Sequence, residues 1–261
     1  MVILSIDIDF FVAPTKRDAP PNPTKRLCHE RYAVDHEHEI RDFLEKKCQL
    51  SRNRRIPGAL IRHHVQGFDI LESIFLSTNR PSKLVHVDAH DDLGVGDCAY
   101  SYLLTDWLHE PRDKRPPPKR GDDGLNLGNW LAFAAAAGFV ESVEFIPRWY
   151  PPSYILQCYF DKDPVHAERM RFCPISPEDL STNFCQHGLK QWRSFLRSQE
   201  ARTTVSWMIT ELRNFAMESH PDFVFFCQSP AYTPATADTI LEMAKEYIHI
   251  DTLGLTLVEP V

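Results

Sequence analysis

The sequence predicts one α/β domain built around a mostly parallel sheet. Short apolar runs alternate along the chain with segments of helical periodicity, and this alternation is typical of strands joined by crossover helices. The 261 residues are long enough for one large core, and no strong linker divides them. Clusters of Asp and His follow several of the runs, at the strand ends where α/β proteins bind their ligands. We therefore expect a single domain over residues 1–261.

The spacing of apolar residues predicts each element. Apolar runs predict strands over 2–8, 59–61, 84–88, 143–146, 203–209 and 222–226. Apolar residues at helical spacing predict helices over 34–48, 68–75, 102–108, 129–139, 189–195 and 236–248. Pro-rich polar stretches predict loops at 14–25 and 110–123, the second as a rim for a polymeric substrate, and residues 151–185 lack a regular pattern.

Composition limits the partners and the compartment. The chain has 29 Lys+Arg and 36 Asp+Glu, a formal net charge of −7, which argues against general binding to nucleic acid or to an anionic membrane. Its seven cysteines are scattered and include no Cys-x-x-Cys pair, so we expect neither a disulfide framework nor a zinc knuckle. No apolar run approaches the roughly 20 residues that span a bilayer, and no export signal opens the chain. These features predict a soluble cytoplasmic protein.

An Asp-x-His-x-Asp cluster ends the strand predicted over 84–88. Asp88, His90 and Asp92 share one face if the chain stays extended past the end of the strand. So many carboxylates beside an imidazole are costly to bury unless a cation or strong hydrogen bonds compensate them. This cluster predicts a metal site, and a solvated acidic loop is the alternative.

Further metal-ligand types follow two other predicted strands. Asp7 and Asp9 share a face where the first strand leaves the core, between apolar neighbours. His63 and His64 lie at a turn between a strand and the helix that starts at Phe68. One ligating histidine is the functional interpretation of that pair, and a histidine that only caps or packs the turn is the alternative.

Four aspartates and two histidines are enough to hold two divalent ions with a bridging solvent molecule. The ligand set is rich in oxygen and lacks a cysteine thiolate, which favours Mn²⁺ over a zinc site built on sulfur. Two dications would offset four carboxylate charges, so we expect metal to raise the thermal stability. Hydrolysis at a planar, weakly electrophilic carbon is the natural use of such a site.

These motifs resemble those of a known enzyme superfamily. Asp88-Ala-His-Asp-Asp92 together with Ser5-Ile-Asp-Ile-Asp9 resembles the paired signatures of the arginase/deacetylase superfamily. The wider set is similar to the peptide arginase branch, and it comprises Asp7-Ile-Asp-Phe-Phe11, Pro57-Gly58 with His63-His64-x-x-x-Phe68, His86-Val-Asp-Ala-His-Asp-Asp-Leu-Gly-Val-Gly-Asp97, Gly128-Asn-Trp-Leu-Ala-Phe133 and Ser229-Pro-x-Tyr-Thr-Pro234.

The resemblance implies a three-layer arginase-like fold with helices on both faces of the sheet. It also implies hydrolysis of arginine side chains in a ribosomally made precursor peptide, leader plus core, to ornithine and urea. In the commonest arginases the Asp-x-Asp pair follows the Asp-x-His-x-Asp segment, whereas here it opens the chain, so we expect a permuted strand order. Such a permutation need not move strand ends in space.

The resemblance also assigns roles to single residues. Asp88 and Asp7 would bridge two manganese ions, His64 and Asp92 would complete one, and His90 and Asp9 the other. The separation of 24 positions from His64 to Asp88 resembles the family spacing and favours His64 over His63. Loop position makes Asp97 and His109 candidates for catalysis and Gln228, Ser229 and Tyr232 candidates for substrate binding. For Asp97, His109, Gln228 and Ser229, loop capping or surface solvation is the alternative.

Other functions fit the same residues. An amide deacetylase with one zinc ion would need fewer aspartates, so Asp7 or Asp9 to Ala would leave much of its activity. A ureohydrolase of a free small guanidino compound would use the same metals without a peptide. The alternative without catalysis is a metal-binding or scaffold protein that retains a relict site. The sequence does not settle the oligomeric state.

Overall fold

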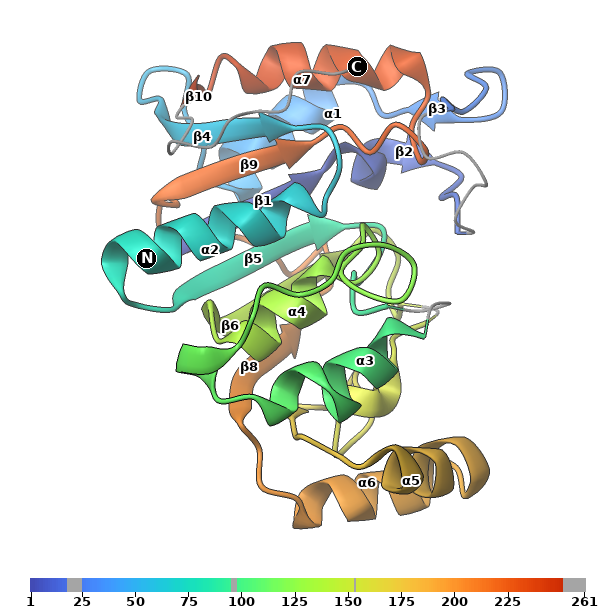
Figure 1. Cartoon of the computed structure of the whole chain (residues 1–261). Helices are drawn as coiled ribbons and strands as arrows, with labels where there is room; N and C mark the ends of the chain where they lie inside the picture. Colours follow the sequence, from blue (N-terminus) through green and yellow to red (C-terminus); the bar gives the residue numbers. More distant parts are fainter. Residues whose placement is uncertain (18–24, 95–97, 153, 251–261) are drawn as a thin grey trace.

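The computed structural model describes residues 1–17, 25–94, 98–152 and 154–250. Eight strands form one central sheet in the order β10-β4-β9-β1-β5-β6-β8-β7 (Figure 1). The strands are β1 (Val2–Asp7), β4 (Ile56–Ile61), β5 (Ser82–Asp88), β6 (Val140–Pro147), β7 (Arg169–Phe172), β8 (Thr203–Ile209), β9 (Phe223–Cys227) and β10 (Ile248–Ile250). All neighbouring pairs are parallel except β7 with β8. A separate antiparallel pair joins β2 (Val12–Ala13) to β3 (Ala33–Val34).

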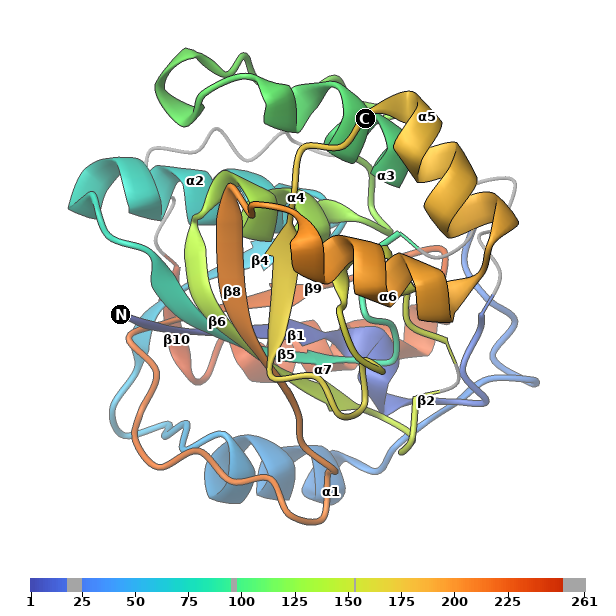
Figure 2. The ribbon, with the colours of Figure 1, turned by 90° about the horizontal axis from the view of Figure 1, so that it is seen from below.

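Helices cover both faces of this sheet, so the fold has three layers (Figure 2). On one face lie α2 (Gln66–Thr78), α3 (Ala99–Thr105), α4 (Trp130–Ala137), α5 (Pro177–Leu180) and α6 (Leu189–Ser198). On the other face lie α1 (Glu37–Asp42) and α7 (Asp238–Ala244). Short helical turns complete the chain: η1 (Ile8–Phe11), η2 (Phe43–Lys47), η3 (Trp107–His109), η4 (Arg112–Lys114), η5 (Gln157–Tyr159), η6 (Ser181–Gln186) and η7 (Ala235–Ala237).

The two faces of the sheet belong to two apolar cores, and the alternation of strand side chains divides residues between them. In β1, Ile3 packs toward α2 and α4, whereas Leu4 and Ile6 pack toward α1 and α7. Because both faces are covered, the central strands are apolar almost throughout, which is typical of a parallel sheet. The buried polar side chains of β1 and β5, which are Ser5, Asp7, Ser82, His86 and Asp88, share the face toward α2 and α4.

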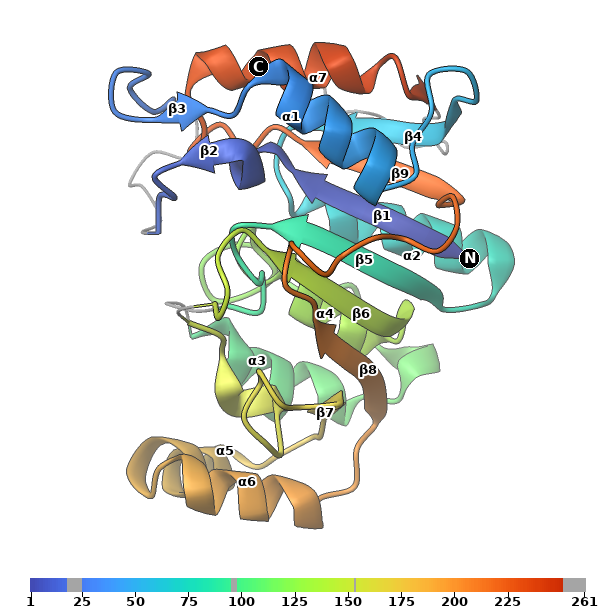
Figure 3. The ribbon, with the colours of Figure 1, turned by 180° about the vertical axis from the view of Figure 1, so that it is seen from behind.

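The first strand lies in the middle of the sheet, between β9 and β5 (Figure 3). Ser5 pairs with His86 and Ile6 with Val87, so the ends of β1 and β5 lie side by side. Asp7 pairs with Cys227 on the other side. The opening strand of the chain is therefore next to the strand that carries the Asp-x-His-x-Asp cluster.

The predicted α/β class and mostly parallel sheet are confirmed, and so are the six predicted strands. Several boundaries differ. η5, β7 and α5 lie in residues 151–185, and η6 begins there, although no regular pattern was evident in that stretch. The signal that was available is the alternation in β7 of buried Met170 and Phe172 with more exposed Arg169 and Arg171. The last helix ends at Ala244; residues 245–247 form a turn, and β10 begins at Ile248.

Within the described ranges, no helix is both long and apolar enough to cross a membrane.

Candidate metal centre

Matching turns at the ends of β1 and β5 set up the site. Asp7 Oδ1 accepts a hydrogen bond from the backbone N–H of Asp9 (3.0 Å), and Asp88 Oδ1 accepts one from the N–H of His90 (2.8 Å). An Asp that bonds the backbone two residues on is typical of a tight turn. In each turn Oδ1 of the aspartate is occupied by the backbone hydrogen bond. The other carboxylate oxygen, Oδ2, faces the helix layer of α2 and α4.

His64 meets these oxygens from the turn before α2. Its Nε2 lies 3.0 Å from Ser5 Oγ, which fixes the ring. Its Nδ1 then lies 3.1 Å from Asp7 Oδ2, 3.0 Å from Asp88 Oδ2 and 2.9 Å from Asp92 Oδ2. A ring nitrogen carries at most one hydrogen, so hydrogen bonding cannot account for three carboxylate oxygens around one Nδ1. We call Asp7, His64, Asp88 and Asp92 the inner position.

Asp92 is held by its own backbone and by α4. Its φ is 52°, a left-handed conformation that turns the chain back after β5. Its Oδ2 accepts a hydrogen bond from Nε1 of Trp130, whose ring lies 4.8 Å from that of His64. Gly67 allows this approach, because a Cβ there would lie 2.9 Å from the Trp130 ring. Asp88, His90 and Asp92 therefore meet their partners through a turn, and the extended chain predicted past Asp88 is wrong.

A second group, the outer position, consists of Asp9, Asp88 and His90. His90 Nδ1 lies 3.0 Å from Asp9 Oδ2 and 3.6 Å from Asp88 Oδ1. His90 Nε2 donates to the carbonyl oxygen of Lys16 (2.8 Å). A metal-bound histidine commonly donates its other ring N–H to a carbonyl in this way. In the neutral ring Nδ1 is then a lone pair facing a carboxylate oxygen, an arrangement that needs a cation or a proton between them.

The buried charges of the cluster also require a compensating cation or proton. Burial raises the pKa of Asp9 well above its ordinary value, and the nearby Asp7 and Asp88 carboxylates add to the increase. Burial alone would lower the pKa of His90, but Asp9 and Asp88 outweigh it and raise that pKa well above 6.5. Without a metal, the cluster therefore holds protons to offset its charge.

The donor atoms fit divalent metal ions. Within the described residues, buried Asp9 Oδ2, His64 Nδ1 and Asp88 Oδ2 have no hydrogen-bond partner. Metal–ligand bonds of about 2.0–2.2 Å place neighbouring ligand atoms about 3 Å apart in an octahedral site, which matches the separations around His64 Nδ1. The inner and outer positions share Asp88, so the cluster has ligands for two ions.

Two residues that the sequence did not single out as ligands also reach this cluster. His86 precedes Asp88 by two positions and is fully buried, and its Nε2 lies 3.5 Å from Asp88 Oδ2. Cys227 ends β9 beside Asp7, and its Sγ lies 3.2 Å from Ser229 Oγ. Burial, with the Asp7 charge, raises the pKa of the Cys227 thiol well above 9. For His86 the available signal was strand alternation, which puts it on the same face as Asp88. For Cys227 it was the position at the end of a strand, just before Gln228.

The structure brings some of the predicted substrate residues to the cluster. Ser229 Oγ donates a hydrogen bond to Asp7 Oδ2. The Tyr232 ring lies 4.9 Å from the His90 ring, and burial raises the pKa of Tyr232 to about 12. Gln228 turns away, because its Nε2 donates to Asp238 of α7 (2.9 Å).

The remaining candidates lie elsewhere. His63 is half-buried, and burial together with Arg62 lowers its pKa; the ring that meets the carboxylates is that of His64. His109 Nε2 donates to the carbonyl oxygen of Ile175 (3.1 Å), and the His109 carbonyl accepts from Arg202, just before β8 begins. That is the amino end of the parallel strands, so the structure does not bring His109 to the cluster. Asp97 lies outside the described residues.

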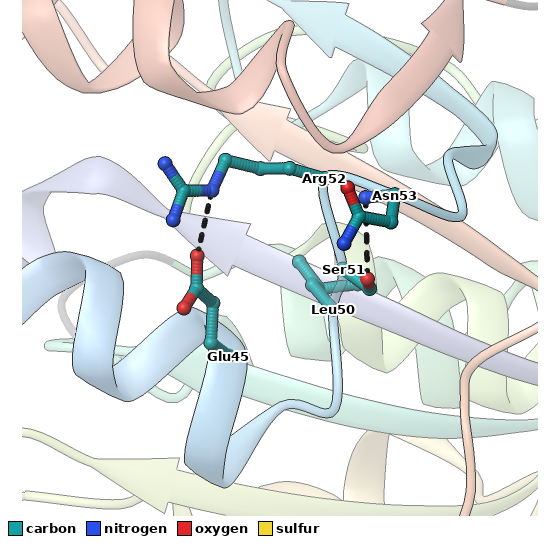
Figure 4. Close-up of a pocket in the computed structure, with 5 residues that line it drawn as sticks. All are labelled: Glu45, Leu50, Ser51, Arg52 and Asn53. Carbon is teal, nitrogen blue, oxygen red and sulfur yellow. Dashed lines mark hydrogen bonds and ion pairs between the residues drawn. The ribbon is translucent and has the colours of Figure 1, made fainter.

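A surface pocket near η2 is separate from this centre. Figure 4 shows its lining by Glu45, Leu50, Ser51, Arg52 and Asn53, with Glu45 paired to Arg52 (3.0 Å). These residues precede β4 and so lie at the amino ends of the strands, opposite the carboxyl ends that carry the metal ligands.

Comparison with protein-family models finds no match, and a search of curated proteins finds no significant match.

Proposed function

We propose that this protein is a manganese-dependent hydrolase that converts arginine side chains of a ribosomally made precursor peptide to ornithine, with release of urea. Water adds to the guanidinium carbon, and the bond from that carbon to the side-chain nitrogen breaks. The peptide loses CH₂N₂ overall. The observation that carries the proposal is that Asp88 joins two ligand groups, one around His64 Nδ1 and one around His90 Nδ1.

The arrangement of strands supports an arginase-like, permuted fold. The Asp-x-Asp pair lies on the first strand of the chain, yet β1 is hydrogen-bonded to β5, so the two motifs meet across neighbouring strand ends. The sequence motifs quoted above point to the peptide-modifying branch. Asp7, His64, Asp88 and Asp92 would hold one ion, and Asp9, Asp88 and His90 the other.

When bound, a pair of divalent ions supplies a nucleophile from water near neutral pH and stabilises developing charge. The chain supplies the positioning: Ser5 fixes His64, the Lys16 carbonyl fixes His90, and Trp130 fixes Asp92. The net charge of −7 also favours the approach of a cationic guanidinium group.

Substrate would enter from the outer position. The side chain of His90 is 26% exposed, whereas those of His64 and Asp88 are 3% and 1% exposed. The Tyr232 ring lies against His90, so we assign Tyr232 to the wall along which the aliphatic part of an arginine side chain packs.

The experiment is an incubation of the Mn²⁺-loaded protein with free arginine, an arginine-containing peptide and an acetyl-lysine peptide, followed by assays for urea, acetate and peptide mass. Urea with loss of CH₂N₂ from the peptide alone supports the proposal. Urea from free arginine alone would identify a ureohydrolase of small guanidino compounds, and acetate without urea would identify a deacetylase.

Two matched variants sharpen this test. Asp9→Ala removes one ligand of the outer position, so urea release should fall to background. Asp42→Ala removes an exposed carboxylate of α1 that pairs only with Lys46 among the described residues, so urea release should stay at the wild-type rate. Near-normal activity of Asp9→Ala would contradict a two-metal mechanism.

A further inference from the structure

The ring of His86 is fully buried in an aromatic box. It lies on β5 opposite Ser5 of β1 and Phe145 of β6. The Phe145 ring stacks on it at 5.5 Å, the Trp130 ring meets it edge-on at 5.7 Å, and the His64 ring lies 5.4 Å away. A phenylalanine would match these surroundings, so the choice of an imidazole needs a reason.

Neither ring nitrogen of His86 makes a hydrogen bond of good geometry within the described residues, although the backbone of His90 lies close enough to act on its pKa. A neutral imidazole carries one N–H donor and one lone pair, and burying either without a partner is costly. The Ser5 hydroxyl, opposite His86 on β1, is engaged with His64 Nε2 instead. The cost points to a partner for His86 that is not a protein side chain.

The Nε2 atom of His86 points toward the metal ligands. It lies 3.5 Å from Asp88 Oδ2 and 3.9 Å from Asp92 Oδ2, which is too far for good hydrogen bonds. Ligand atoms around one octahedral ion with bonds of about 2.1 Å are separated by about 3–4 Å, and both distances lie within that range. His64, His86 and Asp88 can accordingly present one donor atom each to the same ion.

We propose that His86 Nε2 is a further metal ligand at the inner position. That position then has two imidazoles, from His64 and His86, whereas the outer position has only His90. Imidazole suits Zn²⁺ and Co²⁺, and carboxylate suits Mn²⁺, so the inner position discriminates more strongly for Zn²⁺ or Co²⁺ over Mn²⁺ than the outer one does. Mn²⁺ in excess still fills both. The proposal rests on the metal centre of the proposed function and is independent of the substrate.

Cys227 does not compete for this role. Its Sγ already lies 3.2 Å from the Ser229 hydroxyl and 3.8 Å from the carbonyl oxygen of Arg62. Unlike His86, the Cys227 side chain has protein partners.

The test is His86→Phe, which keeps an aromatic ring in the box and removes both nitrogens. The metal-free variant should melt at the same temperature as the wild type or higher, because two unpartnered buried nitrogens are gone. Its stabilisation by Zn²⁺ should shrink, and its affinity for Zn²⁺ should fall by at least about tenfold, the minimum seen when even an outer partner of a ligand is lost. His166→Gln, which removes an exposed histidine, should match the wild type in every measurement.

An unchanged Zn²⁺ affinity and an unchanged metal-induced melting shift in His86→Phe would overturn the proposal. If that variant fails to fold, NMR of the Co²⁺-loaded wild type gives a second test, since each bound imidazole contributes one strongly shifted exchangeable N–H signal. Three signals support His86 as a ligand beside His64 and His90, and two signals overturn it. Two signals together with urea release would refute the role of His86 as a ligand and leave the proposed reaction standing. Three signals without urea release would refute only the proposed reaction.

Discussion

Removal of the metal should reverse the way stability depends on pH. In the metal-free protein, burial would lower the pKa values of His64 and His90, but neighbouring carboxylates raise both well above 6.5, among them Asp92 for His64 and Asp9 for His90. A raised folded-state pKa contributes stability that is complete below the unfolded value and is lost as the pH rises through the folded value. Metal-free protein should therefore lose stability between pH 6.5 and pH 8.

The magnitude follows from counting protons. Above pH 6.5 unfolded histidines are mostly neutral, so the folded chain binds up to two more protons than the unfolded chain through His64 and His90. Each extra proton changes the free energy of unfolding by about 1.4 kcal/mol per pH unit, so two protons give a decline of up to about 2.7 kcal/mol per unit. His86, whose pKa burial lowers, is neutral in both states in this range. Asp88, whose pKa the adjacent His64 and His90 lower despite burial, is ionised in both.

Metal should have the opposite effect, because ions displace these protons and bind more tightly as the pH rises. The assay is urea denaturation at pH 6.5, 7.2 and 8 in chelator and in excess Mn²⁺. In the metal-free protein, Asp9→Asn should reduce the slope of unfolding free energy against pH by the amount that one proton contributes, since His90 loses the anion that raises its pKa. The exposed substitution Asp42→Asn should leave this slope unchanged. Metal-free stability that is flat or rises from pH 6.5 to 8 would refute the reasoning.

Three further predictions concern how the ligands are held. Trp130→Phe removes the indole donor to Asp92, which should destabilise the fold by about 1.5–3 kcal/mol and weaken Mn²⁺ binding about 10–100-fold in a metal titration. Gly67→Ala places a Cβ 2.9 Å from the Trp130 ring and should cost about 1–3 kcal/mol in denaturant unfolding; wild-type stability would show that α2 and α4 can separate freely. His64→Ala should abolish tight binding of one ion per chain, as counted by elemental analysis, while His63→Ala should keep both.

Much of the centre could be predicted because it depends on strand alternation. Asp7 and Asp88 follow apolar runs, and the ends of parallel strands meet at one edge of a sheet. That reasoning needs no knowledge of which strands are neighbours. It accordingly predicts that Asp7 and Asp88 meet, although β1 opens the chain and β5 begins 80 residues later. Asp9 and Asp92 reach the cluster through the helical turn η1 and a left-handed residue, which alternation does not predict.

The remaining parts depend on tertiary contacts that a local pattern does not contain. Gln228 and Ser229 are adjacent in the chain, yet one bonds Asp238 in α7 and the other bonds Asp7. Ser229 has a φ of 43°, so the chain turns sharply between the two side chains. Loop position alone could not separate them. His109 likewise follows a helix, but only the observed fold places it at the amino ends of the strands.

The geometry of Asp88 explains why a strand ending in Asp-x-His-x-Asp can serve two ions. An ideal strand would point Asp88, His90 and Asp92 to one side but spread them over about 13 Å, which is too far for all three to surround a single ion. Here β5 stops at Asp88, whose Oδ1 binds the next turn and approaches His90, while its Oδ2 approaches His64. The left-handed Asp92 then returns the chain toward His64. The turn thus divides one motif between two positions.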